Sequence, residues 1–214
     1  MAIRALFPTF YLKASLQRPG WARLNLALAD ECRSLALSDS AGRRWSARHY
    51  HGGYTSYGSH DQLHLLSAPF SDLRRRIDSH VTAFARALHY DLGGRVLAMT
   101  DCWANVMPAG AAHSLHLHPS SFVSGTYYVE VPRGAGALKF EDPRLGLHMA
   151  TPPRRASAPP RLKSFVNVPA RAGDLVLFES WLRHEVPAAR FTGERISISF
   201  NYRWTAKPAA RRRG

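Results

Sequence analysis

The clearest pattern along the chain is an apolar stripe between Leu73 and Leu88. Apolar residues recur there at intervals of four, four, three and four positions, with arginines and aspartate around the other face. This spacing predicts an amphipathic helix that ends near Gly93-Gly94. Residues 21–37 show a similar periodicity and predict an earlier helix.

Residues 1–94 make up the N-terminal part. Outside the two predicted helices, its patterns indicate strand and loop. Residues 3–7 form a short apolar run that predicts a first strand. Residues 42–57 are rich in aromatic residues and glycine, which favours a strand and an exposed loop. We therefore expect one strand and the helices to pack on the part that follows.

From Arg95 onward the pattern changes to short strands separated by proline and glycine. Helices followed by strands indicate a single domain over residues 1–214, with a β core over 95–203 that closes as a sandwich or barrel. Proline-rich residues 143–163 predict a lid or a disordered insertion, and 204–214 form a basic tail. The predicted strands are 95–107, 114–118, 121–131, 136–141, 164–169, 174–178 and 194–203.

Composition narrows the class of protein. Hydrophobic residues make up 45% of the chain, yet no apolar run approaches the roughly 20 residues that a membrane-spanning helix needs. Pro8 follows too closely on the N-terminus for a signal peptide, so we expect a soluble cytoplasmic protein. Two cysteines, Cys32 and Cys102, are too few for a disulfide framework and are expected to be structural thiols.

The net charge of +14 is large for 214 residues and attracts polyanions. Most of the arginines are scattered, however, and the one cluster, 211–213, stands at the C-terminus. Nucleic-acid binding is therefore the minority interpretation.

The histidines suggest a metal site. His116 and His118 are separated by one residue, so on an extended strand their imidazoles project from the same face. His184 follows the apolar strand 175–178 and is expected to arrive beside them. Such a group can hold a metal with open positions. His113 has the opposite parity and is expected to point away unless a bulge intervenes. Ordinary surface or core roles are expected for His49, His51, His60, His64, His80, His89 and His148.

A second candidate feature lies on the strand that begins at Arg195. Arg195, Ser197, Ser199 and Asn201 alternate with apolar residues, so four polar side chains share one face. A polar barrel interior is costly unless it is a binding site. A guanidinium group there is suited to bidentate binding of a carboxylate.

Five short motifs together carry a resemblance to one enzyme family. They are Gly52–Ser56, His116–Pro119, Ser124–Tyr128, Phe140–Arg144 and Arg195–Asn201. With these motifs the chain is similar to the Fe(II)/2-oxoglutarate-dependent oxygenases, and more narrowly to a bacterial and phage group of them. This resemblance implies a mainly β fold with accessory helices and a double-stranded β-helix core, of the jelly-roll or cupin-like type.

The resemblance implies a ligand set for Fe(II). His116 and His184 match the first and last metal ligands of the family. His118 stands where most members carry Asp or Glu, although the narrower group also has histidine there. Imidazoles alone leave the metal its full dicationic charge and also suit Zn, Cu and Ni. Glu141 or Asp142 is the less favoured source of a carboxylate ligand.

The resemblance also implies a cosubstrate site. Arg195 matches the residue that pairs with the distal carboxylate of 2-oxoglutarate, and Ser197 lies on the right face to help. Tyr128 and Asn105 match positions that contact the cosubstrate in related enzymes. Core packing with a satisfied polar tip is the alternative for Tyr128 and Asn105.

These observations lead to one main hypothesis and two others. The first is a dioxygenase that uses Fe(II), 2-oxoglutarate and O2 to hydroxylate a C–H bond of a small-molecule or peptide substrate, with His116, His118, His184 and Arg195 as its catalytic group. The second is a three-histidine cupin-type dioxygenase that does not use 2-oxoglutarate. The third is a basic nucleic-acid-binding protein with a vestigial metal site. A homodimer is left open.

Overall fold

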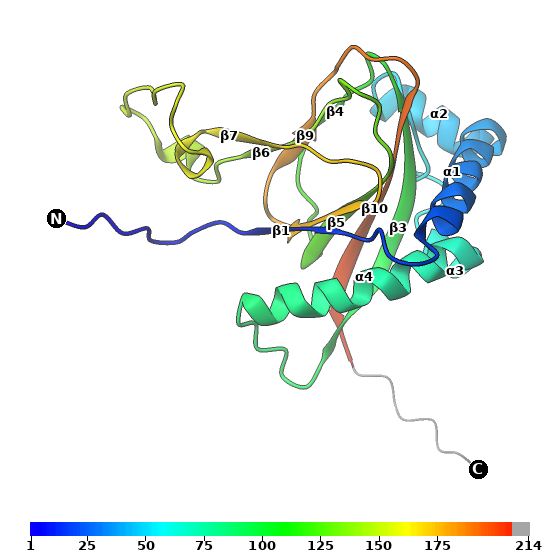
Figure 1. Cartoon of the computed structure of the whole chain (residues 1–214), viewed down its shortest axis with the longest axis horizontal. Helices are drawn as coiled ribbons and strands as arrows, with labels where there is room; N and C mark the ends of the chain where they lie inside the picture. Colours follow the sequence, from blue (N-terminus) through cyan, green and yellow to red (C-terminus); the bar gives the residue numbers. More distant parts are fainter. Residues whose placement is uncertain (207–214) are drawn as a thin grey trace.

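The computed structural model of this protein describes residues 1–206, and its centre is a pair of antiparallel sheets (Figure 1). The larger sheet has six strands, in the order β1 (Tyr11–Ser15), β8 (Asp174–Glu179), β5 (Val123–Glu130), β10 (Glu194–Thr205), β3 (Val96–Pro108) and β2 (Tyr54–Thr55). The smaller sheet has four strands, in the order β4 (His113–His116), β9 (His184–Val186), β6 (Leu138–Glu141) and β7 (Phe165–Val168).

The path of the chain between these sheets defines the fold. From β3 to β6 successive strands alternate between the larger and the smaller sheet, and they alternate again from β7 to β10. All strand pairs are antiparallel. This is a double-stranded β-helix, so the expected fold class, mainly β with accessory helices, is confirmed.

Helices cover the outer face of the larger sheet. The helices are α1 (Trp21–Ser38), α2 (Ser40–His49), α3 (Leu63–Leu66) and α4 (Ala68–Ala87), and two 3-10 turns follow, η1 (Leu145–Leu147) and η2 (Pro160–Leu162). The apolar faces of α1 and α4 share one core with the outward residues of β10, which explains the helical stripe in the sequence. Within residues 1–206, no helix has both the length and the apolar character needed to cross a membrane.

Close packing on this outer face explains one glycine of the Ser-Gly-x-Tyr-Tyr motif. A Cβ at Gly125 would stand 2.5 Å from Phe200 and 2.7 Å from Leu177, both of which are fully buried. The two cysteines lie in the same core as free thiols, and burial raises the pKa of Cys102 to about 12. Their expected structural role fits this environment.

A second apolar cluster lies between the two sheets and closes one part of the barrel interior. It joins Met107, Tyr128 and Phe178 of the larger sheet to Leu138 and Phe140 of the smaller one. The remaining interior, on the inner face of β3, β5 and β10, is polar. This is the face that carries the candidate site.

The structure differs from the predicted elements at three places. No strand forms over residues 3–7, because that segment pairs with nothing in the sheets, and the first strand is β1, which pairs with β8. Residues 42–57 contain the predicted strand only as the short β2, and most of helix α2, which was not predicted, precedes it. The Asp39 side chain caps this helix by accepting from the Gly42 N–H at 2.8 Å. The three-residue strand β9 was not expected as a strand.

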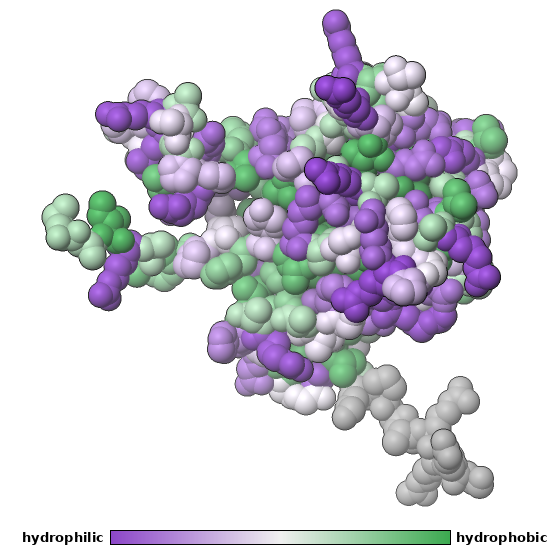
Figure 2. All heavy atoms as spheres, in the orientation of Figure 1, coloured by the Kyte–Doolittle hydropathy of each residue, from purple (hydrophilic) through white to green (hydrophobic). Residues whose placement is uncertain are grey.

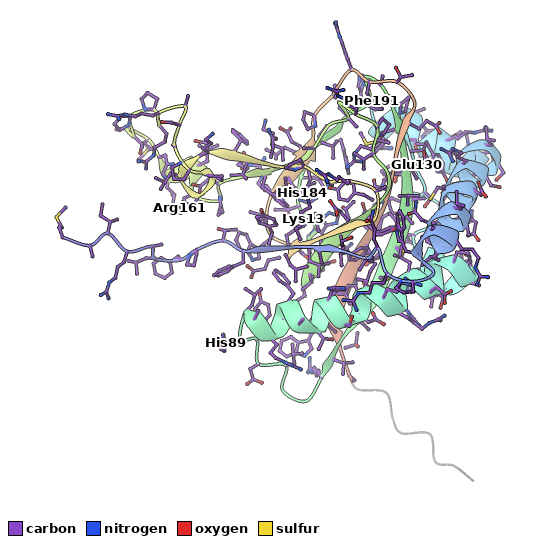
Figure 3. All side chains as sticks on the ribbon, viewed as in Figure 1. Lys13, His89, Glu130, Arg161, His184 and Phe191 are labelled. Atoms are coloured by element: carbon purple, nitrogen blue, oxygen red, sulfur yellow. The ribbon has the colours of Figure 1, made fainter. Side chains whose placement is uncertain are left out.

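Two segments project from the body of the molecule. The proline-rich segment 143–163 extends beyond β6 and β7, and its Arg161 lies well away from His184 near the centre of the barrel (Figure 3). The N-terminal arm extends on the same side and exposes the apolar residues Ile3, Leu6 and Phe7 (Figure 2). Trp204 and Thr205 belong to β10, and the rest of the predicted basic tail, from 207 onward, lies outside the described residues.

Candidate metal and cosubstrate site

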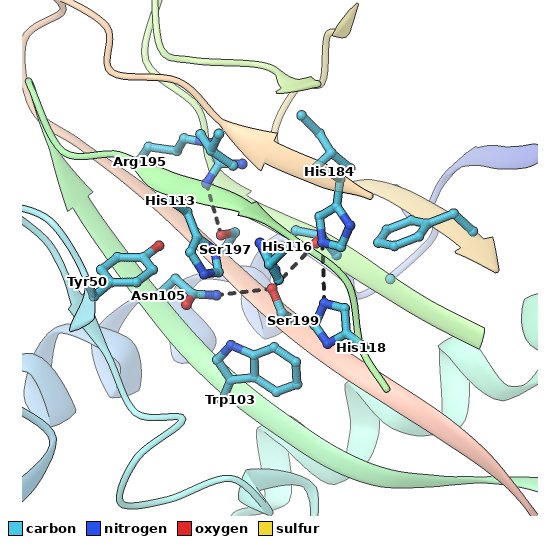
Figure 4. Close-up of a pocket in the computed structure, with 15 residues that line it drawn as sticks. Tyr50, Trp103, Asn105, His113, His116, His118, His184, Arg195, Ser197 and Ser199 are labelled. Atoms are coloured by element: carbon cyan, nitrogen blue, oxygen red, sulfur yellow. Dashed lines mark hydrogen bonds between the residues drawn. The ribbon is translucent and has the colours of Figure 1, made fainter. Parts of the chain in front are cut away.

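Three histidines meet at one end of the barrel interior. His116 ends β4 and is the direct cross-strand partner of His184, the first residue of β9. His118 follows β4, and its backbone N–H donates to the Ser180 carbonyl at 3.0 Å. The three side chains each offer a ligand atom, and these atoms lie within 4.8 Å of one another. The structure thus brings together the three histidines that the sequence selected (Figure 4).

Backbone carbonyls orient two of the three rings. The Nδ1 of His116 lies 2.7 Å from the Ser114 oxygen, and the Nδ1 of His184 lies 2.9 Å from the Leu182 oxygen. A carbonyl oxygen can only accept, so each Nδ1 carries the proton and each Nε2 keeps its lone pair. The Nε2 of His184 lies 3.3 Å from that of His118, and their rings are almost parallel. The carbonyl contacts thus leave the Nε2 lone pairs of His116 and His184 free for a metal, and without a metal the His184 Nε2 can accept from His118 Nε2.

Burial keeps these imidazoles neutral. Burial and the neighbouring His116 ring lower the pKa of His118 to about 3. Burial and the same neighbour lower the pKa of His184 to about 2. The pKa of His116 is lowered by burial as well. A neutral imidazole is the form that binds a metal, so the group is ready to do so near neutral pH.

The carboxylates that were considered as ligands are engaged elsewhere. Glu141 accepts from the Arg183 guanidinium at 2.7 Å. Asp142 is held by Arg144 at 2.9 Å, and this hydrogen bond lowers the pKa of Asp142. Within residues 1–206, the metal-binding group therefore consists of histidines alone.

Arg195 lines the same pocket as the histidines and is only 2% exposed. Its Nη1 donates to the Ser197 hydroxyl at 3.1 Å and lies 3.4 Å from the Met107 sulfur. Among residues 1–206 it forms no ion pair with a carboxylate, and its Nε has no hydrogen-bond partner. A buried cation without a counter-charge is costly, so this site is built for an anion.

Tyr128 and Asn105 differ from ordinary core residues. The Arg195 guanidinium lies 5.1 Å from the centre of the Tyr128 ring, and the Tyr128 hydroxyl is buried without a partner in residues 1–206. Asn105 donates to the Ser199 hydroxyl at 3.1 Å, but its carbonyl oxygen has no partner in that range. Each of these two residues therefore keeps one buried polar atom without a partner in residues 1–206, which core packing alone does not explain.

His113 and Tyr50 line the pocket although the sequence analysis did not select them. His113 was expected to point away, but the β4–β9 register shifts between His113 and His116, and the His113 ring lies 4.0 Å from the His116 ring. Tyr50 lies in the segment 42–57, for which a strand and an exposed loop were expected, yet it is buried and its ring lies 4.8 Å from that of His113. A bulge and a ring contact leave no signal in residue spacing.

The fold and the pocket together define a class: a double-stranded β-helix in which three imidazoles and a buried arginine face one cavity. Residues 101–201 match the profile of a family described as "Putative 2OG-Fe(II) oxygenase". This match and the shared fold of solved structures confirm the resemblance drawn from the motifs. No curated protein sequence gives a significant match.

Solved structures share this fold over nearly the whole chain. A prolyl-4-hydroxylase from Pseudomonas putida is 22% identical, with 92% of this chain and 94% of that chain covered and a TM-score of 0.61. HygX from Streptomyces hygroscopicus, with nickel, 2-oxoglutarate and hygromycin B bound, is 15% identical, with 91% and 83% covered and a TM-score of 0.58. The epimerase SnoN, in complex with Fe3+, alpha ketoglutarate and nogalamycin RO, is 16% identical, with 94% and 82% covered and a TM-score of 0.58.

Proposed function

We propose that this protein is an Fe(II)- and 2-oxoglutarate-dependent dioxygenase that hydroxylates a C–H bond of a small-molecule or peptide substrate. One observation carries the proposal. His116, His118 and His184 face the same pocket as Arg195, a buried cation that lacks a carboxylate partner within residues 1–206. A metal chelated by a dicarboxylate would satisfy both features at once.

The residues of the pocket fit these two groups. Three neutral imidazoles form a ligand set that suits Fe(II) and leaves positions open. Arg195 Nε and the Tyr128 hydroxyl are buried donors without a partner in residues 1–206, as a distal carboxylate would require. The two negative charges of 2-oxoglutarate would also offset two of the three positive charges of the metal and the guanidinium, for which the pocket lining within residues 1–206 holds no carboxylate.

Each part of the chain has a distinct task in this proposal. Fe(II), 2-oxoglutarate and O2 supply the oxidation, which places one oxygen atom in the substrate and releases succinate and CO2. The three histidines hold the metal, and the Ser114 and Leu182 carbonyls fix two of the rings. Arg195 and Ser197 bind and orient the distal carboxylate. Apolar pocket residues such as Phe178 limit access of water.

The segment 143–163 is proposed to cover the bound substrate. It leaves the barrel after β6, whose Phe140 pairs directly with His184, so it begins at the metal end of the barrel. Similar structures hold hygromycin B, nogalamycin RO or a peptide fragment, which supports a small-molecule or peptide substrate.

The function can be tested without knowledge of the substrate. Protein reconstituted with Fe(II) is supplied with 2-oxoglutarate, O2 and ascorbate as the reductant in place of a substrate, and succinate is measured. We expect slow succinate release that falls at least about 100-fold in Arg195→Ala and is unchanged in Arg161→Ala, which alters an exposed arginine of the 143–163 segment. Absence of succinate with the unmodified protein would contradict the proposal. Oxygen uptake without 2-oxoglutarate would favour a three-histidine cupin-type dioxygenase instead.

A further inference from the structure

His113 is a fourth imidazole in the pocket, although strand parity directs it elsewhere. The ladder between β4 and β9 pairs His113 with Val186 and His116 with His184, and the register shifts between these two pairs. The extra residue turns the His113 side chain to the side occupied by His116. Bulges of this kind redirect a side chain at a local cost to strand pairing, so this inward position needs a reason.

The surroundings of the ring are aromatic on two sides and open to the pocket. The His113 ring lies 4.0 Å from the His116 ring and 4.8 Å from the Tyr50 ring, and Figure 4 shows it between them. The ring also lines the cavity that Arg195 lines. Neither ring nitrogen makes a hydrogen bond to another residue within 1–206.

Two simpler roles do not fit these observations. The first is a fourth metal ligand, but among the described residues, 1–206, the group of ligand atoms within 4.8 Å of one another comprises His116, His118 and His184 and not His113. The second is packing, but a phenylalanine would stack on Tyr50 equally well and would not bring to the cavity two polar nitrogens that lack a hydrogen-bond partner in residues 1–206. The nitrogens of His113 are thus left to face whatever occupies the cavity.

We propose that His113 is a cosubstrate-binding residue, whose ring N–H donates a hydrogen bond to a carboxylate of the bound 2-oxoglutarate. Tyr50 acts as a positioning residue that holds the ring through their contact. This inference rests on the proposed function, because it needs a dicarboxylate between the histidines and Arg195. Metal binding by the other three histidines does not need His113 to face the pocket, whereas this role explains its inward position.

The test measures binding and does not depend on turnover. Titration calorimetry follows Ni(II) binding first, and then 2-oxoglutarate binding to the Ni(II)-loaded protein, since imidazole ligands also suit nickel. His113→Phe keeps an aromatic ring and removes both nitrogens. His113→Asn and His113→Gln each return an amide N–H, at the positions of Nδ1 and Nε2 respectively. The matched control is His49→Phe, because the His49 ring also stacks on an aromatic residue, Trp45, but is exposed outside the pocket.

We expect His113→Phe to bind Ni(II) as the unmodified protein does and to bind 2-oxoglutarate roughly 10-fold to 100-fold more weakly. One of the two amide variants should recover most of this loss, and His49→Phe should show none. Unchanged 2-oxoglutarate affinity in a folded His113→Phe protein would overturn the inference, and so would a selective loss of Ni(II) binding. If the unmodified protein binds no 2-oxoglutarate, or binds it equally well after Arg195→Ala, the proposed function itself fails.

Discussion

The buried guanidinium of Arg195 donates a hydrogen bond to the hydroxyl of Ser197, two residues along the same strand, at 3.1 Å. This neutral oxygen is a weak partner for a cation that is 2% exposed. Without a bound anion, the protein therefore carries the desolvation cost of a charge that no carboxylate in residues 1–206 compensates. Function and stability should consequently respond in opposite directions when Arg195 is replaced.

Arg195→Met should make the metal-free and ligand-free protein more stable. Methionine fills much of the same volume beside Met107 and removes the uncompensated charge. We expect a gain of about 1 kcal/mol, seen as a rise of about 2–4 °C in the midpoint of thermal unfolding. The same variant should lose 2-oxoglutarate binding. Arg161→Met changes an exposed arginine and should change neither quantity, whereas a destabilised Arg195→Met protein would contradict this explanation.

His184→Ala should weaken metal binding by roughly 100-fold or more, because it removes one of three ligands. The comparison is His51→Ala, which removes an exposed histidine outside the metal-binding group and should leave metal affinity unchanged. Competition with a chromophoric chelator measures both proteins. Equal affinities would show that His184 does not hold the metal.

The metal-free protein should lose stability when the pH falls below about 6.5. Burial lowers the pKa of His184 to about 2 and that of His118 to about 3, whereas an unfolded histidine titrates near 6.5. Below about pH 6.5 the unfolded chain therefore binds more protons than the folded one, and the free energy of unfolding decreases as the pH is lowered. Urea unfolding at several pH values between 7 and 5 measures the slope. In His184→Asn the slope of the free energy of unfolding against pH should be smaller by up to about 1 kcal/mol per pH unit.

Tyr128→Phe should separate cosubstrate binding from folding. The Tyr128 hydroxyl is buried without a partner in residues 1–206, so its removal should leave the thermal stability of the ligand-free protein unchanged or slightly raised. If this hydroxyl reaches the distal carboxylate beside Arg195, 2-oxoglutarate affinity should fall roughly 10-fold. Calorimetry on the Ni(II)-loaded protein provides the measurement, and an unchanged affinity would remove Tyr128 from the cosubstrate site.

Much of the fold could be predicted because it follows from periodicity. The helical stripe from Leu73 to Leu88 and the alternation from Arg195 to Asn201 each reflect one buried face, and α4 and β10 carry these faces in the structure. Helix α2 was missed because Trp45 and the glycines resemble a strand and loop. The sequence signal for this helix is its N-cap residue, Asp39, whose side chain accepts a hydrogen bond from the Gly42 N–H three residues later.

The candidate site was predictable as far as spacing and motif describe it. The resemblance to the family's motifs and the strand spacing selected four residues, His116, His118, His184 and Arg195. The structure places all of them around one pocket. His113 and Tyr50 could not be found in this way. His113 turns inward through a register shift, and Tyr50 reaches the pocket from the chain just after α2, so both depend on tertiary contacts.

The central claim is that a metal held by the three histidines and a 2-oxoglutarate held by Arg195 occupy a single site. Anaerobic titration of the protein with Fe(II) and then 2-oxoglutarate tests it most directly, with the visible charge-transfer band of the chelate as the signal. We predict a band that saturates at one Fe(II) and one 2-oxoglutarate per chain and is absent in His184→Ala. If Fe(II) binds and 2-oxoglutarate produces no band, the two groups do not meet in this pocket and the claim is wrong.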